Sequence, residues 1–424
     1  MLEEIVSKLK AGSSNLDMRD LQIDFAKMHP EQILKLTISV LDEAPLCRAF
    51  ELSILGLMPI SDWDLLAAYA IKKFQVSEVA QEIVSFAALQ KPDSLHPYLE
   101  TFILTGNEAW TIPLLAWRGS GSLDKDRLLR LMEPGDGRTL MNRVFAFGLL
   151  LETRDQQVIL DAIAKAAAVE LFAEQGTAPL QLHLNGVGLE FDGGSFRKLH
   201  SDEVLHIAFP EDYFPEEESA FGTRDKTYQP TWQLQDRSLI RADAIIGGLV
   251  EERCKICSNQ LHRLLEFTDR AVLPEFYREC PSTFVTCLTC QGKTGIWEFF
   301  FAHSQTGAIE HMYEGEPIVP ELLESAFVQS EVQLVDTGPR WAIQDHSLSN
   351  SWENMHRVGG SPSWVQFCEY LKCPRCLQTM NFAAQIDSGL PMEDGSEWMW
   401  GDSGACYLFF CGDCSVTGVT YQCY

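Results

Sequence analysis

The chain has 424 residues, 46% of them hydrophobic, and a formal net charge of −27 from 60 acidic and 33 basic residues. This length is too great for one ordinary domain and indicates two or three folded domains. The negative charge would repel phosphate backbones, so it argues against direct nucleic-acid binding and favours a basic protein partner. The simpler alternative is a solvated acidic surface without a binding role.

The N-terminus and the hydropathy of the chain predict a cytoplasmic location. Residues 1–10 lack the uninterrupted apolar core and the small-residue cleavage site of a secretory signal. No stretch approaches the roughly 18 uncharged apolar residues that a membrane span needs. We therefore expect no membrane association. In the reducing cytoplasm, closely spaced cysteines are more often metal ligands than disulfides.

Residues 1–172 are predicted to form an all-α domain. Apolar residues recur there at spacings of three and four, and the connections between these segments are short. The expected helices cover residues 20–27, 31–41, 63–74, 94–104, 109–117, 124–132, 139–151 and 155–168, with a further one starting at Ser77. Serial amphipathic helices of this kind usually stack as antiparallel pairs in a HEAT-like solenoid, or less often form a compact bundle.

The pattern changes after residue 172, and residues 173–424 are predicted to form a mixed α/β domain rich in antiparallel sheet. The stretch Pro179–Leu184 alternates between apolar and polar residues, which favours a strand. Val204–Phe209 is typical of a buried strand that ends before Pro210. Glu216–Glu218 is an acidic run of the kind that is usually a solvated loop.

Four Cys-x-x-Cys pairs in this second domain form two sets of four cysteines. The first set is Cys254, Cys257, Cys287 and Cys290, and the second is Cys373, Cys376, Cys411 and Cys414. Thiolates are soft donors that suit zinc, and a Cys-x-x-Cys turn brings two sulfurs within about 2.3 Å of one ion. The sequence therefore predicts two structural zinc ions. Four cysteines fill the coordination shell and leave no open position for catalysis.

Other interpretations of the cysteines remain open. A redox-active Cys-x-x-Cys pair or reduced, buried thiols are alternatives, although a redox motif normally needs one pair beside a βαβ unit. The pairs are also farther apart than in a usual zinc ribbon, with 29 residues between Cys257 and Cys287 and 34 between Cys376 and Cys411. The five cysteines without an assigned role are Cys47, Cys280, Cys368, Cys406 and Cys423; of these, Cys280 and Cys406 are alternative ligands.

The second domain also shows signs of internal duplication, with halves at about 173–300 and 301–424. Cys254–Phe267 parallels Cys373–Ile386, because in both segments the cysteine pair leads into an apolar strand. Each half also has a Gly-Gly pair upstream of its cysteines, at 247–248 and 359–360. Matched cysteine pairs in the same order rarely arise by chance.

The C-terminal part of the chain resembles the YwqG-like domain family. The residues that carry this resemblance are 358–366, Cys373–Cys376, Met380–Ile386, Gly401–Gly404 and Tyr407–Cys411. The resemblance covers about 350–424 well and 175–350 loosely, and residues 1–170 lie outside it. It implies a bacterial, duplicated, mixed α/β domain with much antiparallel sheet. It supplies no catalytic residue.

The sequence contains no nucleophile elbow, His-Glu-x-x-His helix or dinucleotide-binding glycine pattern. We therefore expect a non-enzymatic, zinc-binding interaction protein, in one specific form an immunity or antitoxin-like protein whose acidic surface binds a basic toxin or effector. One alternative is an enzyme with a site in an interdomain cleft that uses His200, Asp202 or His206. Another is a zinc- or redox-sensing regulator with exposed thiolates.

Overall fold

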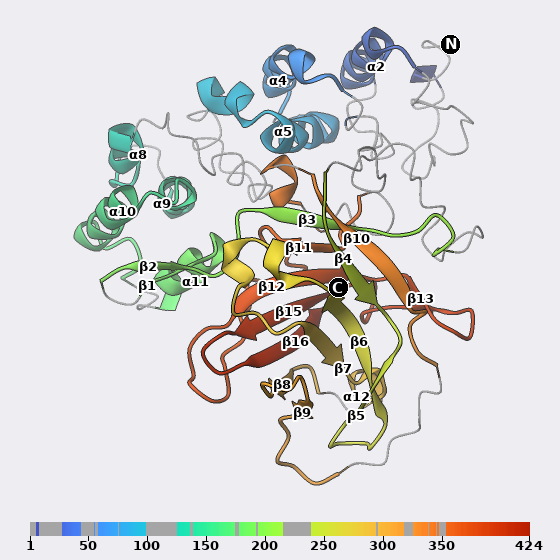
Figure 1. The fold of residues 1–424 in the computed structure, drawn as a ribbon. Coiled ribbons are helices and arrows are strands. Elements are labelled where there is room, and N and C mark those ends of the chain that lie inside the picture. The colour runs from blue at the N-terminus through green and yellow to red at the C-terminus, as the bar shows by residue number, and fades with distance from the viewer. Residues whose placement is uncertain are drawn as a thin grey trace. The chain divides into compact units, whose positions relative to one another are not determined.

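In a computed structural model, the chain separates into two compact units. Unit 1 comprises Met1–Val187 with Phe191–Phe196, and unit 2 comprises Gly188–Glu190 with Arg197–Tyr424. The structure describes residues 6–7, 28–43, 55, 58–74, 76–98, 125–135, 139–173, 178–191, 194–214, 239–293, 296–317, 325–337, 339–344, 346 and 353–424. Figure 1 shows the helices of unit 1 and the large sheet of unit 2.

The regular secondary structure described in unit 1 is helical, apart from residues of the short strands β1 and β2. Its α-helices are α2 (Pro30–Glu43), α4 (Trp63–Ile71), α5 (Glu78–Gln90), α8 (Lys125–Leu131), α9 (Leu140–Glu152), α10 (Gln156–Ala168) and α11 (Ala178–Gly186), and its 3₁₀ helices are η3 (Ile60–Asp62) and η4 (Pro92–Tyr98). These positions confirm six of the predicted helices. The predicted helices at 20–27 and 109–117 lie outside the described residues, and the one at 94–104 lies partly outside them.

Side-chain caps explain where several of these helices begin. The hydroxyl of Ser77 accepts a hydrogen bond from the Ala80 N–H, and Asp155 accepts one from Val158. Thr139 and Asn142 form a reciprocal capping box at the start of α9. Each cap satisfies an amide that the helix leaves unpaired. Within unit 1, α4 packs against α5, and α9 packs against α8 and α10.

The strand predicted at Pro179–Leu184 is wrong, because these residues belong to α11. Pro179 lies in the first turn of the helix, where its missing N–H costs nothing. The ring of His183 packs against Phe147 at 5.9 Å and Phe172 at 5.4 Å between centroids. This packing against other residues of unit 1 outweighs the alternating pattern of a short segment.

Unit 2 is built on one large antiparallel sheet. Its strands, in spatial order, are β5 (Leu249–Arg253), β6 (Gln260–Phe267), β4 (Ile240–Ile246), β10 (Ser330–Asp336), β3 (Val204–Ala208), β11 (Arg357–Gly359), β12 (Asn381–Asp387), β15 (Ala405–Cys411), β16 (Val416–Gln422), β8 (Phe299–His303) and β9 (Ile309–His311), and β7 (Thr283–Thr286) pairs with β6. The two ends of this order lie side by side, because the Ile309 N–H donates to the Glu252 carboxylate at 3.2 Å.

The remaining elements of unit 2 and of the segment that joins the units are short. They are β1 (Leu189–Phe191) with β2 (Phe196–Lys198), β13 (Leu390–Pro391) with β14 (Glu397–Trp398), α12 (Leu288–Lys293), η6 (Arg270–Val272), η7 (Glu275–Tyr277) and η8 (Pro339–Ala342). The observed mixture of helices and antiparallel sheet agrees with the predicted fold class. The HEAT-like arrangement of unit 1 stays a prediction.

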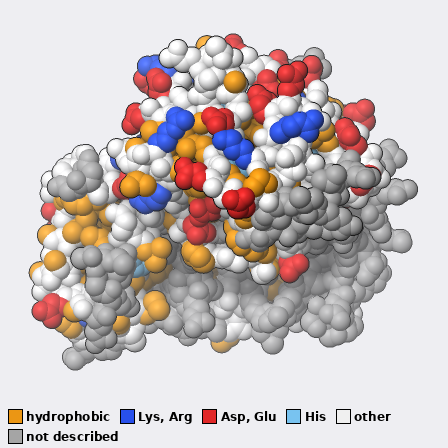
Figure 2. Space-filling model, turned by 90° about the horizontal axis from the view of Figure 1, so that it is seen from below, with side chains coloured by type: hydrophobic (Ala, Val, Ile, Leu, Met, Phe, Trp, Pro, Cys, Tyr) orange, Lys and Arg blue, Asp and Glu red, His pale blue; other side chains and the backbone are white. Residues whose placement is uncertain are grey.

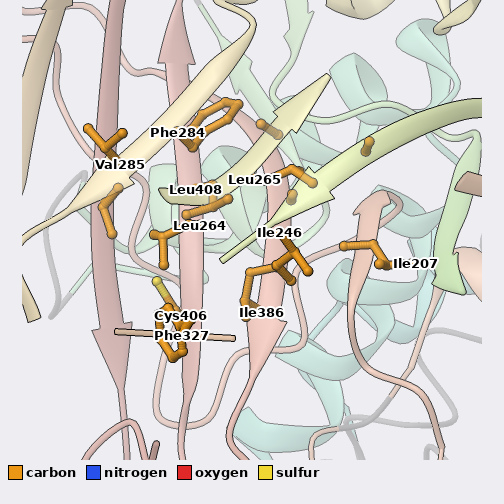
Figure 3. Close-up of a cluster of buried hydrophobic side chains, with 14 of the residues drawn as sticks. Ile207, Ile246, Leu264, Leu265, Phe284, Val285, Phe327, Ile386, Cys406 and Leu408 are labelled. Carbon is orange, nitrogen blue, oxygen red and sulfur yellow. The ribbon is translucent and has the colours of Figure 1, made fainter. Parts of the chain in front are cut away.

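Strand β15 separates two hydrophobic cores. All seven of its residues are buried, and its sequence is a continuous apolar run. Because side chains alternate between the faces of a strand, Cys406, Leu408 and Phe410 enter one core, whereas Tyr407 and Phe409 enter the other. Figure 3 shows Cys406 and Leu408 in the first core. A strand covered on both faces needs no polar alternation.

The cysteine turns of the two halves have the same backbone geometry. The residues that follow them, Ser258 and Leu377, both have positive φ angles, of 65° and 62°. Their N–H groups donate to Cys254 O and Cys373 O, both at 2.8 Å. The register of the following strand pair shifts at the same offset in each half, between Arg263 and Leu265 and between Phe382 and Ala384. These matches fit the predicted duplication.

The two Gly-Gly pairs also have matched conformations. Gly247, Gly248, Gly359 and Gly360 all have φ angles between 70° and 75°. A Cβ added to Gly359 would lie 2.3 Å from the Glu203 carbonyl oxygen. At Gly247 it would lie 2.2 Å from the Val328 carbonyl oxygen. Because the obstructing atoms belong to the backbone, neither position has room for a side chain.

Gly359→Ala is therefore expected to lower the free energy of unfolding by about 3 kcal/mol or more, through left-handed strain and a backbone clash. Gly395→Ala is the matched control, since Gly395 has a φ of 84° but no atom within 4 Å of the added Cβ. It should cost only about 1–2 kcal/mol. Denaturant unfolding measures both, and equal costs would contradict the role given to the clash.

Among the described residues, no helix has both the length and the apolar character that crossing a membrane requires.

Candidate metal centres

The first metal centre lies at the end of β5, the end of β7 and the beginning of α12. Cys254 directly follows β5, and Cys257 completes the turn into β6. Cys287 directly follows β7, and Cys290 lies in the first turn of α12. The antiparallel pairing of β6 with β7 and β5 brings the two turns together. The Asn259 side-chain amide donates to the Thr289 hydroxyl at 2.8 Å and links them.

The second metal centre is formed at the corresponding ends of β12, β15 and β16. The turn with Cys373 and Cys376 precedes β12, while Cys411 ends β15 and Cys414 lies in the turn before β16. The Arg375 guanidinium donates to Cys414 O at 2.9 Å and joins the two turns. All eight predicted ligands are therefore brought together in the two predicted sets of four.

The sulfur positions fit tetrahedral coordination of a metal ion. In each set, the four sulfur atoms all lie within 4.8 Å of one another. The Sγ–Sγ distances are 3.7 Å for Cys254–Cys290, 3.4 Å for Cys257–Cys287 and 3.7 Å for Cys376–Cys411. A tetrahedron with Zn–S bonds of about 2.3 Å has edges of about 3.8 Å. All eight thiols are free of disulfides.

The electrostatics of the sets indicate what a cation would contribute. Hydrogen bonds from Cys287 and Cys290 lower the pKa of Cys254, and donating those bonds raises the pKa of both donors. In the second set, a backbone hydrogen bond at Gln378 lowers the pKa of Cys376, while burial raises that of Cys411. Without a cation, neither set favours four thiolates. A divalent ion would favour full deprotonation, so metal binding should release protons.

His311 lies beside the first centre, and no Cys- or His-based motif in the sequence points to it. Its Nδ1 is 3.5 Å from the Cys254 sulfur and accepts a hydrogen bond from the Lys255 N–H at 3.2 Å. Its ring stacks on Phe301, with 5.0 Å between centroids. By accepting the Lys255 N–H, His311 supports the cysteine turn, and the four cysteine sulfurs form the set without it.

The remaining cysteines lie outside both sets. Cys280 and Cys406 are fully buried in the hydrophobic core, and burial raises the pKa of each thiol. They are therefore not the alternative ligands considered from the sequence. Burial also raises the pKa of Cys368, to about 12, and Cys423 is partly buried. Cys47 lies outside the described residues.

The residues considered for an enzymatic site do not converge. His200 is buried and its Nδ1 contacts Ser201 O at 3.1 Å, whereas Asp202 is half exposed and pairs with Lys198 at 2.5 Å. His206 is buried elsewhere, and its Nε2 lies 3.0 Å from the Gln344 side-chain oxygen. These separate environments count against the predicted cluster as a catalytic site.

A partly buried histidine gives unit 2 a defined acid sensitivity. Burial lowers the pKa of His303 to about 4, although Glu252 opposes the shift. The unfolded value is about 6.5, so the unfolded chain binds the proton more readily. Above about pH 6.5, His303 is neutral in both the folded and the unfolded chain and does not lower the free energy of unfolding. As the pH falls from there towards 4, the unfolded chain takes up the proton first, and the free energy of unfolding decreases.

His303→Asn should remove this contribution. Between pH 7 and pH 5.5, the loss in free energy of unfolding should be about 1 kcal/mol smaller in the variant than in the unchanged protein. Denaturant midpoints at the two pH values measure the difference. If both proteins lose the same stability, His303 is not the titrating group.

Comparison with known proteins places the chain in no family. No family model matches it, and no solved structure matches it. A segment of 66 residues is 42% identical to the uncharacterized protein YpfL of Salmonella typhimurium strain LT2. That segment is 16% of this chain and 14% of YpfL, so the match spans far less than two thirds of this relative.

Proposed function

We propose that this protein is a non-enzymatic protein-interaction module whose unit 2 is held together by two structural zinc ions. The observation that carries the proposal is the two closed sets of four cysteine sulfurs. Four thiolates favour zinc over harder cations such as magnesium and calcium, which prefer oxygen ligands. They also leave no coordination position for a substrate. Zinc at these positions stabilises the sheet ends that carry the cysteine turns.

The partner that fits this chain is a basic protein. The net charge of −27 favours association with a basic surface and speeds its encounter. In Figure 2, acidic and basic side chains of the described residues are interspersed with hydrophobic ones on the face shown. Such a mixed surface is compatible with a specific interface. In its specific form, the proposal is an immunity or antitoxin-like role in the cytoplasm. Unit 2 would then be a YwqG-like domain, and the helices before it would be HEAT-like.

Co-purification from the native host, followed by reconstitution from purified components, tests the partner. We expect a stoichiometric complex with a protein of net positive charge, with a dissociation constant that rises at least tenfold between 50 and 200 mM NaCl. The apo protein, prepared with a chelator, is the control and should lose the complex. A complex that forms equally with an acidic protein, or that ignores salt, would count against this partner.

A further inference from the structure

The two metal centres differ in how far solvent reaches their sulfur atoms. In the first centre, Cys254, Cys287 and Cys290 are at most 1% exposed, and Cys257 is partly exposed. In the second centre, Cys376 is exposed and Cys414 is partly exposed. The two centres have matched turns, so this difference comes from the residues around them and not from the ligand pattern.

Neighbouring side chains account for the difference. Ile256 and Leu288 are fully buried beside the cysteines of the first centre, and His311 lies against the Cys254 sulfur. In the second centre, the residue after Cys376 is Leu377, which is 73% exposed. A small oxidant can therefore reach Cys376 more easily than any sulfur of the first centre, where the most accessible cysteine, Cys257, is only partly exposed.

We propose that the second centre, formed by Cys373, Cys376, Cys411 and Cys414, is a peroxide-responsive zinc site that releases its ion on oxidation while the first centre keeps its own. The proposal rests on zinc occupying both centres. It gives the chain a function beyond structural support. Loss of the ion from the second centre would change the surface that this centre stabilises, so that surface would respond to peroxide.

The chemistry uses one peroxide for two thiolates. The Cys376 thiolate attacks one oxygen of hydrogen peroxide, breaking the O–O bond and giving a sulfenic acid and hydroxide. The Cys411 thiolate then attacks the Cys376 sulfur, and the S–O bond breaks to release a second hydroxide. The two sulfurs lose two electrons in total, which reduce the peroxide. Two of the four ligands are now a disulfide, so the zinc ion leaves.

Within the second centre, the geometry allows Cys376 and Cys411 to react with each other. The Cys376 and Cys411 sulfur atoms are 3.7 Å apart, so a small movement of the exposed turn brings them to the bonding distance of about 2.05 Å. The Arg375 guanidinium is fixed by its bond to Cys414 O and places a positive charge near the centre. Positive charge favours a reactive thiolate.

The test uses the zinc-loaded full chain and hydrogen peroxide, with released zinc followed by a colorimetric chelator. We expect one of the two ions to leave at least tenfold faster than the other, and mass spectrometry after alkylation to find a Cys376–Cys411 disulfide. The proposal would be overturned if both ions left at the same rate or if neither ion left. It would also be overturned if the ion of the first centre left first.

Matched variants locate the reaction without removing the metal. Cys376→His replaces the exposed thiolate by another zinc ligand and should slow peroxide-driven release at least tenfold. Cys257→His makes the same change at the equivalent position of the first centre and should leave release unchanged. Equal slowing by both variants would contradict the proposal. Fewer than two ions before peroxide is added would instead contradict the proposed zinc content, on which the redox response depends.

Discussion

Cys287→Ser is expected to remove the ion from the first metal centre and to unfold the part of unit 2 around it. Cys287 is fully buried, and a serine hydroxyl is a poor replacement for a thiolate ligand. A structural zinc ion contributes about 10–16 kcal/mol of apparent binding free energy. This is comparable to the whole stability of a typical domain, about 5–15 kcal/mol. Elemental analysis should give at most one zinc per chain, and thermal unfolding should lose its cooperative transition for unit 2.

Cys423→Ser is the control for this experiment, because Cys423 is partly buried and belongs to neither set of four. This variant should keep two ions and unfold within about 1 kcal/mol of the unchanged protein. A Cys287→Ser protein that retained both ions and its unfolding midpoint would show that the first set does not hold a structural metal.

Arg357→Met is expected to lower the free energy of unfolding of unit 2 by about 3–5 kcal/mol. Arg357 lies on β11 and is fully buried. Its guanidinium donates to Gly359 O and Ser361 O, and to the Ser363 hydroxyl at 3.1 Å. Methionine is of similar length, so it would fill much of the space but would leave these buried acceptors without their donor.

Arg278→Met is the matched control, since the Arg278 side chain is 70% exposed and pairs only at the surface with Glu275. Its cost should stay below about 1 kcal/mol. Denaturant unfolding that follows unit 2 compares the two variants. Similar small costs for both would mean that the Arg357 network is not a major source of stability.

The metal ligands could be predicted from the sequence because their signal is local. A Cys-x-x-Cys turn places both sulfurs within a few residues, and repetition of the turn at Cys254 and Cys373 identifies the two sets. Likewise, the helices capped at Ser77, Thr139 and Asp155 have their start signals within a single turn. These features depend little on the rest of the fold.

Features that depend on distant residues could not be predicted in the same way. His311 reaches Cys254 only because β9 lies beside β5 at the meeting ends of the sheet. The exposure of Cys376 depends on whether side chains from other parts of the fold cover it. The Cys-x-x-Cys spacing carries no information about those side chains. The strand wrongly predicted at 179–184 shows the same limit, since packing by His183 decides its conformation.

The most direct test of the central claim is the zinc content of the purified, unoxidised full chain, measured by elemental analysis against protein concentration. The two closed sets of cysteine sulfurs predict two zinc ions per chain, retained on dialysis and lost with a strong chelator together with the folded structure of unit 2. A value near zero in a protein that is nevertheless folded would contradict the claim that zinc holds unit 2 together.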